Sequence, residues 1–286
     1  MTFAYYPGCT AKSEAIEYGE SVEEICQYLG LELYEIPDWN CCGATSGHVI
    51  SRELAIALPS RNLALAERMS LDIVTPCPAC FLRHKVAQYE LKNNPQLKAR
   101  VETDIGMPLK LSQHTKHIIE VLHRDVGIDY IKKKIKKSLR GIKAVTYYGC
   151  YLVRPPEVTE FDDPENPTIM DELMEVLDVE VIDWSRKVDC CGGGLALTNP
   201  EIVKRLVSKI TLSASEVGAE AIITACHLCQ SNLDAYQPRS KNTHPIPIFF
   251  FSELIGLAFG SLRVKGRLKR HMVNPSGLLE GLKTKF

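Results

Sequence analysis

Two pairs of adjacent cysteines are the residues of this sequence best suited to chemistry. Cys41 and Cys42 precede Gly43, and Cys190 and Cys191 precede three consecutive glycines. Adjacent thiols cannot close an unstrained disulfide with each other. They can both face one metal centre where the backbone bends tightly, and glycine allows such a bend. The doublets therefore predict metal binding through thiolates.

The cysteines around these doublets form an internal repeat. In the first half, 31 residues separate an opening cysteine from the doublet, and 34 separate the doublet from a Cys-x-x-Cys motif; the second half has 39 and 34. Equal spacing of doublet and motif indicates a duplicated unit. The first set is Cys9, Cys41, Cys42, Cys77 and Cys80; the second set is Cys150, Cys190, Cys191, Cys226 and Cys229.

Short apolar runs alternate with helical patterns in both halves. Strands are predicted at 3–6, 32–36, 71–75 and 109–111, and at 143–148, 179–183, 221–225 and 246–249. Helices are predicted near 14–29, 50–69, 79–93 and 115–125, and near 167–177, 200–216, 228–236 and 251–259, and Pro59 is expected to kink or split its helix. Such runs are typical of parallel strands covered on both faces. The predicted fold class is α/β, with two pseudo-symmetric α/β domains, each a small mostly parallel sheet flanked by helices.

The cysteines fall at one edge of each predicted sheet, because most of them follow a strand and precede a helix. Ligands of open α/β folds gather at that edge. Helix N-termini there favour the negative charge of thiolates. The topology therefore predicts that each set of five comes together.

Composition limits the class of protein. Eleven cysteines in a chain that begins without a secretory signal predict a reduced, cytoplasmic protein. The near balance of 34 Lys+Arg and 35 Asp+Glu gives no indication of a nucleic-acid partner. The longest apolar run, 245–260, is too short and too polar to cross a bilayer, so no transmembrane segment is expected.

Charge and spacing suggest the domain limits. We predict an N-terminal cysteine-rich domain at 1–130, a basic linker at 131–142, a C-terminal cysteine-rich domain at 143–262 and a basic tail at 263–286. The lysine run in the linker fits a solvated helix, with a docking patch for an acidic partner as the alternative. The tail is expected to be a mobile or partner-binding arm.

Ligand number favours iron–sulfur chemistry. Cys-x-x-Cys alone fits zinc, a redox disulfide or an iron–sulfur cluster. Zinc takes four ligands, and a cubane cluster also needs four thiolates. Five thiolates a set suggest clusters of unusual shape in which one thiolate bridges two irons. Zinc and a redox dithiol remain alternatives.

The doubled pattern, from Tyr5 to about Gly260, resembles the CCG signature of the B subunit of heterodisulfide reductase. Related domains occur in components of glycerol-3-phosphate, lactate, glycolate and succinate oxidoreductases. The resemblance implies that each five-cysteine set holds a noncubane 4Fe-4S cluster, two in all. It also implies that a disulfide binds between the two clusters and is cleaved when each cluster supplies one electron. It also implies two partners, an iron–sulfur donor like the C subunit of heterodisulfide reductase and a flavoprotein like its A subunit, with any membrane association through such partners.

The substrate and direction stay open within this resemblance. Glycines follow both doublets, as in homologues from sulfate reducers and sulfur oxidisers. The disulfide of coenzymes M and B, a protein trisulfide and a lipoyl-protein disulfide are all admissible, and the reaction can run towards disulfide formation. An electron-transfer or quinone-linked subunit of a dehydrogenase is the competing function, and a zinc-binding assembly factor is a third.

A few residues outside the sets carry separate expectations. His227, inside the second Cys-x-x-Cys, is predicted to hydrogen-bond cluster sulfur or to donate a proton to a product thiolate, with a solvent-facing position at the start of a helix as the alternative. Cys26 lies at helical spacing among apolar residues and is expected to be buried. His117 is expected to be structural. Lys187 is expected at the surface, with an anion- or cluster-binding role as the alternative.

Overall fold

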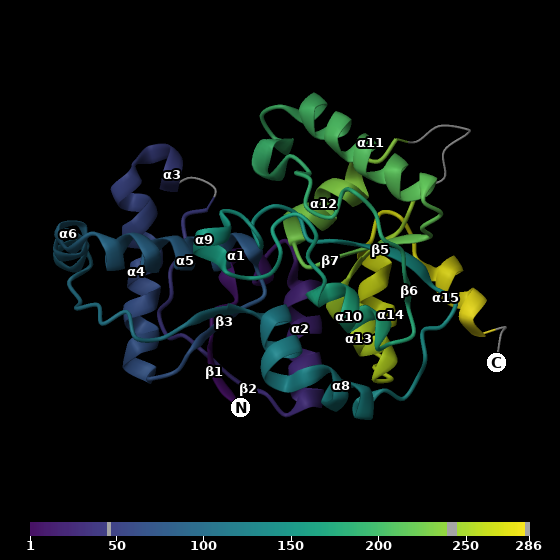
Figure 1. The fold of residues 1–286 in the computed structure, drawn as a ribbon, viewed down its shortest axis with the longest axis horizontal. Coiled ribbons are helices and arrows are strands. Elements are labelled where there is room, and N and C mark those ends of the chain that lie inside the picture. Colours follow the sequence, from purple (N-terminus) through teal and green to yellow (C-terminus); the bar gives the residue numbers. More distant parts are fainter. Residues whose placement is uncertain (45–46, 239–244, 284–286) are drawn as a thin grey trace.

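The computed structural model describes residues 1–44, 47–238 and 245–283 (Figure 1). The first half builds one parallel sheet in the order β2-β1-β3-β4, and the second builds another in the order β6-β5-β7-β8. The identical strand orders confirm the fold class predicted from the repeat. The strands are β1 (Thr2–Tyr5), β2 (Glu32–Glu35), β3 (Ile73–Thr75), β4 (Thr115–His117), β5 (Lys143–Tyr147), β6 (Glu180–Val181), β7 (Ala221–Thr224) and β8 (Ile248–Phe250).

Helices cover both sheets. In the first half they are α1 (Gly8–Ala11), α2 (Ile16–Leu29), α3 (Gly47–Ile50), α4 (Arg52–Met69), α5 (Pro78–Asn93), α6 (Pro95–Ile105), α7 (Ile118–Glu120), a π-helical segment (Val121–Gly127) and α8 (Ile128–Lys134). In the second half they are α9 (Pro156–Thr159), α10 (Ile169–Glu175), α11 (Pro200–Glu216), α12 (His227–Ala235), α13 (Phe251–Ala258), α14 (Val264–Arg267) and α15 (Ser276–Lys283), with 3₁₀ turns at Gly193–Ala196 and Leu268–Arg270. None of the described helices is both long and apolar enough to cross a membrane.

Two local predictions are wrong. The segment 109–111 is not a strand, because the Glu67 carboxylate accepts the backbone N–H groups of Lys110 and Leu111. These groups are therefore not available to a sheet. The fourth strand forms later, at Thr115–His117, so the helix predicted from residue 115 begins only at Ile118. Of the two expectations for Pro59, a kink or a split, the split does not occur, since α4 continues past it to Met69.

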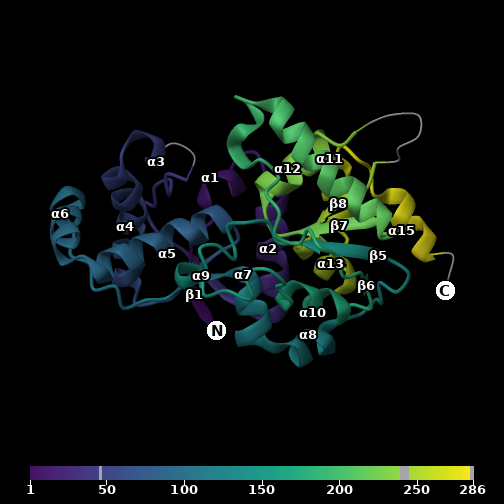
Figure 2. The ribbon, with the colours of Figure 1, turned by 45° about the horizontal axis from the view of Figure 1, so that its top comes forward.

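A single core joins the two halves. Val22 and Ile25 on α2 belong to the same buried cluster as Phe251 and Leu254 on α13. Figures 1 and 2 show α2 lying beside α13 in both views, and the Ser21 and Ser252 hydroxyl oxygens lie 2.6 Å apart at this contact. The first-half helix α2 therefore packs directly onto the second half.

The basic segments at both ends of the second half also contribute to this core. Ile131, Leu139 and Ile142 are buried, and so are Val264 and Leu268. In addition, Arg267 on α14 forms a buried ion pair with Glu24 on α2. The beginning of the tail is thus packed against the first half.

Candidate metal centres

The five cysteines of the first half come together beyond the carboxyl ends of the strands. Cys9 Sγ lies 3.9 Å from Cys41 Sγ, and Cys42 Sγ lies 3.4 Å from Cys80 Sγ. Cys41 also interacts with the adjacent Cys42, and Cys77 interacts with Cys80, since each shifts the pKa of the other. The result is one continuous chain of five thiols, from α1, the loop after β2 and the start of α5.

The second half repeats this arrangement. Cys191 Sγ lies 3.6 Å from Cys229 Sγ, and Cys229 is hydrogen-bonded to Cys226. Cys150 is hydrogen-bonded to Cys190. All ten thiols are free, and so is the eleventh, Cys26, which is buried in the core as expected. The structure therefore gathers each five-cysteine set that the repeat defines.

A glycine before the opening cysteine of each set allows the sulfur atoms to approach the backbone. Gly8 and Gly149 have φ angles of +75° and +67°. A Cβ on Gly8 would lie 2.9 Å from Cys80 Sγ, and one on Gly149 would lie 3.0 Å from Cys229 Sγ. A side chain at either position would therefore be strained in the backbone and would collide with a thiol.

The thiols in each set share their protons unequally. A hydrogen bond from Cys80 lowers the pKa of Cys77 to about 5, and one from Cys150 lowers the pKa of Cys190 to about 6. Hydrogen bonds to neighbouring thiols raise the pKa of Cys80 and Cys150. Each set thus holds thiolates and thiols side by side, and a bound cation would displace the remaining protons.

Backbone and side-chain N–H donors also reach the sulfur atoms of the doublets. The N–H of Gly43 lies 3.5 Å from Cys41 Sγ, and the N–H of Gly192 lies 3.3 Å from Cys190 Sγ. Asn232 Nδ2 lies 3.6 Å from Cys191 Sγ. Donors of this kind tune the potential of sulfur-ligated clusters.

Two tyrosines support the doublets, a role that the sequence analysis missed. The Tyr6 hydroxyl donates to the carbonyl of Asn40 at 2.8 Å, and the Tyr147 hydroxyl donates to that of Asp189. Asn40 and Asp189 directly precede the doublets. The signal was present in the repeat, because both tyrosines stand three residues before the opening cysteine of their set.

His227 connects the two sets. Although it belongs to the second Cys-x-x-Cys motif, its side chain interacts with Cys77 of the first, and each group shifts the pKa of the other. It is 6% exposed, so the solvent-facing alternative is wrong. The position of His227 is taken by Pro78 in the first motif. The two motifs therefore meet through one side chain, and that contact is not symmetric.

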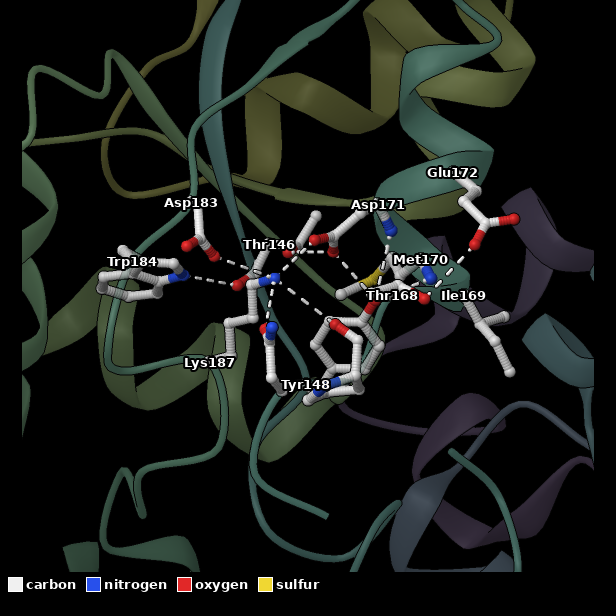
Figure 3. Close-up of polar contacts among 12 residues, drawn as sticks. Thr146, Tyr148, Thr168, Ile169, Met170, Asp171, Glu172, Asp183, Trp184 and Lys187 are labelled. Atoms are coloured by element: carbon white, nitrogen blue, oxygen red, sulfur yellow. Dashed lines mark hydrogen bonds and ion pairs between the residues drawn. The ribbon is translucent and has the colours of Figure 1, made fainter. Parts of the chain in front are cut away.

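A second asymmetric feature holds the opening loop of the second set (Figure 3). Lys187 Nζ lies 2.7 Å from Asp171 Oδ2, and the Tyr148 hydroxyl donates to Asp171 Oδ1 at 2.8 Å. The Lys187 carbonyl accepts from the N–H groups of Tyr148 and Gly149. The expected surface position of Lys187 is wrong, since it is 4% exposed. This buried network fixes the chain directly before Cys150, at Tyr148 and Gly149. In the first half, Pro7 stands in the position of Tyr148.

The donor set fits iron–sulfur clusters. Free, converging thiols that receive N–H donors are the usual ligands of such clusters. Near the first set, Nε2 of the fully buried His84 has no hydrogen-bond partner among the described residues, and its imidazole interacts with Cys42. In the described ranges, no group of three or more His, Cys, Asp or Glu side chains is arranged to hold a single metal ion. The assignment rests on the thiols and on the relatives below.

Comparison with known proteins agrees with the repeat. The family described as "Cysteine-rich domain", or CCG, matches residues 3–83 and again 144–234. The chain is 32% identical over 254 residues to the B subunit of the ferredoxin/F(420)H(2)-dependent CoB-CoM heterodisulfide reductase of Methanosarcina acetivorans, covering 84% of each chain. It is 31% identical over 273 residues to a protein of Archaeoglobus profundus described as similar to the B subunit of heterodisulfide reductase, covering 91% of each.

One relative carries a different name. The "8-methylmenaquinol:fumarate reductase membrane anchor subunit" of Wolinella succinogenes is 31% identical over 263 residues, covering 90% of this chain and 92% of that protein. Among solved structures, a hypothetical protein from Helicobacter pylori has a TM-score of 0.70 at 12% identity, and this chain spans about half of it, 52%. That likeness supports the fold alone. From the duplicated family match and the identity to heterodisulfide reductase B subunits over most of their length, this chain belongs to the CCG cysteine-rich domain family that contains those subunits and whose cysteines imply iron–sulfur clusters.

Proposed function

We propose that this chain is the subunit of a heterodisulfide-reductase-like complex at which a disulfide is reduced or formed. One observation carries the proposal: the two Cys-x-x-Cys motifs lie side by side, since the Tyr18 hydroxyl lies 2.8 Å from the carbonyl oxygens of both Pro76 and Ala225, which directly precede Cys77 and Cys226. Two-electron cleavage of a disulfide by one-electron carriers needs two centres close together. The duplicated sets supply two such places in one chain.

Each set is proposed to hold one noncubane 4Fe-4S cluster. The ligands are Cys9, Cys41, Cys42, Cys77 and Cys80 for one cluster and Cys150, Cys190, Cys191, Cys226 and Cys229 for the other. When bound, each cluster supplies one electron and an iron that accepts a thiolate. The protein's own contribution is to orient the thiolates through N–H donors and glycine turns.

The reaction must also balance protons. Reduction of R–S–S–R′ takes up two electrons and two protons and gives RSH and R′SH. The proposed electron donors are an iron–sulfur protein like the C subunit of heterodisulfide reductase and a flavoprotein like its A subunit, in the cytoplasm. His227 is the proposed proton holder: burial acts to lower its pKa, but the neighbouring Cys77 thiolate raises it to about 9. In the opposite direction the same imidazole would receive a proton from a substrate thiol.

The test compares serine variants of the doublets with a serine variant of the core. Iron, acid-labile sulfide and zinc are measured in protein purified without oxygen, and disulfide turnover is then measured with the chemically reduced protein. The proposal expects about eight irons and eight sulfides a chain, as for two 4Fe-4S clusters. It also expects loss of iron and turnover in Cys42→Ser and Cys191→Ser, and neither loss in Cys26→Ser. Unchanged turnover in the doublet variants, or stoichiometric zinc without iron, would refute it.

A second function is favoured by the relative from Wolinella succinogenes, whose name describes a component of a menaquinol:fumarate reductase. In that case the clusters would pass electrons between partner proteins or a quinone, and no disulfide would be cleaved. The two functions are separated by giving the reduced protein either a disulfide or a menaquinone analogue. The second function would be favoured if the quinone analogue oxidised the reduced protein and the disulfide did not.

A further inference from the structure

The hydroxyl of Tyr18 lies between the two Cys-x-x-Cys motifs. Tyr18 is on α2 of the first half and is 1% exposed. Its oxygen lies 2.8 Å from the carbonyl oxygen of Pro76 and 2.8 Å from that of Ala225. These two residues directly precede Cys77 and Cys226. One side chain therefore contacts the backbone at the entrance of both motifs.

In the first half, the Pro76 carbonyl already has a donor. The His117 Nδ1 accepts the N–H of Ile119 at 3.3 Å, so the ring proton lies on Nε2. That nitrogen donates to the Pro76 carbonyl at 2.8 Å. Burial keeps the imidazole neutral by lowering the pKa of His117 to about 3. The first motif is thus held by a histidine of its own half.

In the second half, the residue equivalent to His117 cannot donate a hydrogen bond to the Ala225 carbonyl. His117 pairs with Thr75 at the end of β4, and Phe250 pairs with Thr224 in the same way at the end of β8. The Phe250 ring has no N–H and instead stacks on Tyr18, with ring centroids 4.3 Å apart at 16°. Among the described contacts, Tyr18 is the donor to Ala225.

A hydroxyl carries a single proton, so Tyr18 donates to one carbonyl at a time. The Pro76 carbonyl keeps His117 as a donor in either case. Without Tyr18, the buried Ala225 carbonyl would have no donor among the described residues, and a buried carbonyl without a donor costs free energy. The hydroxyl of Tyr18 therefore matters more to the second motif than to the first.

We propose that Tyr18 is the positioning residue of the second cysteine set: its hydroxyl does in the second half what the His117 imidazole does in the first, and it ties the Cys226 motif to α2 of the first half. The inference concerns how the motif is held and is independent of any disulfide chemistry.

The first test compares Tyr18→Phe with Tyr5→Phe in the full-length protein. Tyr5 is a matched control, because its hydroxyl is buried and has no partner among the described residues. Hydrogen exchange is followed at the backbone amides of both motifs. Tyr18→Phe should speed exchange around Cys226 about tenfold, the effect of losing one buried hydrogen bond, and should change the Cys77 motif much less. Tyr5→Phe should change neither.

The second test restores the missing donor. Adding Phe250→His to Tyr18→Phe copies the His117 arrangement into the second half, and exchange around Cys226 should return towards the wild-type rate. In iron-loaded protein, the electron paramagnetic resonance signal of one reduced centre should change in Tyr18→Phe and recover in the double variant.

Three results would overturn the proposal. The first is that Tyr18→Phe behaves as Tyr5→Phe in exchange and in the resonance spectrum. The second is that exchange rises equally in both motifs, which would make Tyr18 a general packing residue. The third is that the double variant does not recover, whether because the motif stays loose or because the chain does not fold.

Discussion

The His227 imidazole and the Cys77 thiol belong to different halves of the chain and interact at the junction of the two cysteine sets. Each residue shifts the other towards its charged form: the pKa of Cys77 lies at about 5, mainly through Cys80 and also through His227, and that of His227 at about 9. In the chain without a bound cluster, these shifts favour an imidazolium beside a thiolate in a buried position. Such a pair can hold a proton close to both cysteine sets.

The first prediction concerns this proton. His227→Gln keeps a polar side chain at the junction but cannot carry a proton at neutral pH. Disulfide turnover should fall by about 10²–10⁴-fold, the usual contribution of a positioned acid or base, while iron content stays unchanged. Steady-state rates and iron analysis measure the two quantities.

His114→Gln is the control for that experiment, since His114 is exposed and should be silent in both assays. Unaltered turnover in His227→Gln would remove the proton-holding role. A loss of iron in proportion to turnover would make His227 a structural residue instead.

The second prediction uses two glycines with the same backbone conformation. Gly8 and Gly30 have φ angles of +75° and +71°, but a Cβ would meet Cys80 Sγ only at Gly8 and has open space at Gly30. Alanine should cost about 1–2 kcal/mol at either position through the left-handed backbone. Only Gly8→Ala should also lose the iron of the first set.

Thermal unfolding and iron analysis of the two alanine variants check this expectation. Equal iron content in Gly8→Ala and Gly30→Ala would mean that the sulfur contact is unimportant for cluster binding.

The third prediction concerns the buried ion pair beside the second set. Lys187→Met leaves the Asp171 carboxylate buried without its cation, which should cost about 3–5 kcal/mol of unfolding free energy. The control is Arg186→Met, which breaks the partly exposed pair with Asp189 and should cost about 0–1 kcal/mol. Urea unfolding measures both, and equal costs would contradict a special role for Lys187.

The fourth prediction is a pH dependence from His117. Its pKa is about 3 in the folded chain because of burial, and about 6.5 when unfolded. The unfolded chain therefore binds the extra proton first, so this contribution to stability is present above about pH 6.5 and is lost as the pH falls towards 3.

Unfolding of the wild type and of His117→Gln is compared over a pH series from about 7.5 down to 5.5. The wild type should lose more stability than the variant as the pH falls, because other titrating groups are common to both. Parallel curves would show that His117 does not titrate as its burial indicates.

The gathering of each five-cysteine set and the duplicated α/β fold class could be predicted from the sequence because both follow from the repeat. The order of the strands in each sheet could not. The spacing of the cysteines is enough to define the repeat. In a repeat, corresponding residues lie on corresponding strands and helices. The contact from His227 to Cys77 could not be predicted, because it depends on how the two halves pack. The same holds for Tyr18, which looks like an ordinary apolar position of an amphipathic helix.

The charge of a side chain did not predict whether it is buried, again because burial depends on contacts between distant parts of the chain. Lys187 is buried because Asp171, which is sixteen residues away, meets it in space. Arg267 in the basic tail is buried by Glu24, from the opposite end of the chain. The domain limits at 130, 142 and 262 remain a prediction, and the shared core suggests that the halves do not fold independently.

Joining two copies of a domain in one chain has a consequence for the choice of substrate. Two identical protomers would offer the same surroundings to both ends of a bound disulfide. Here the copies have diverged, with His227 opposite Pro78 and Tyr148 opposite Pro7. For the proposed reaction, the two sulfur atoms of R–S–S–R′ would therefore meet different neighbouring side chains. A protein built from a repeat could then bind an unsymmetric disulfide in one orientation. Mixed disulfides of two unlike thiols are the substrates whose two orientations such a site could distinguish.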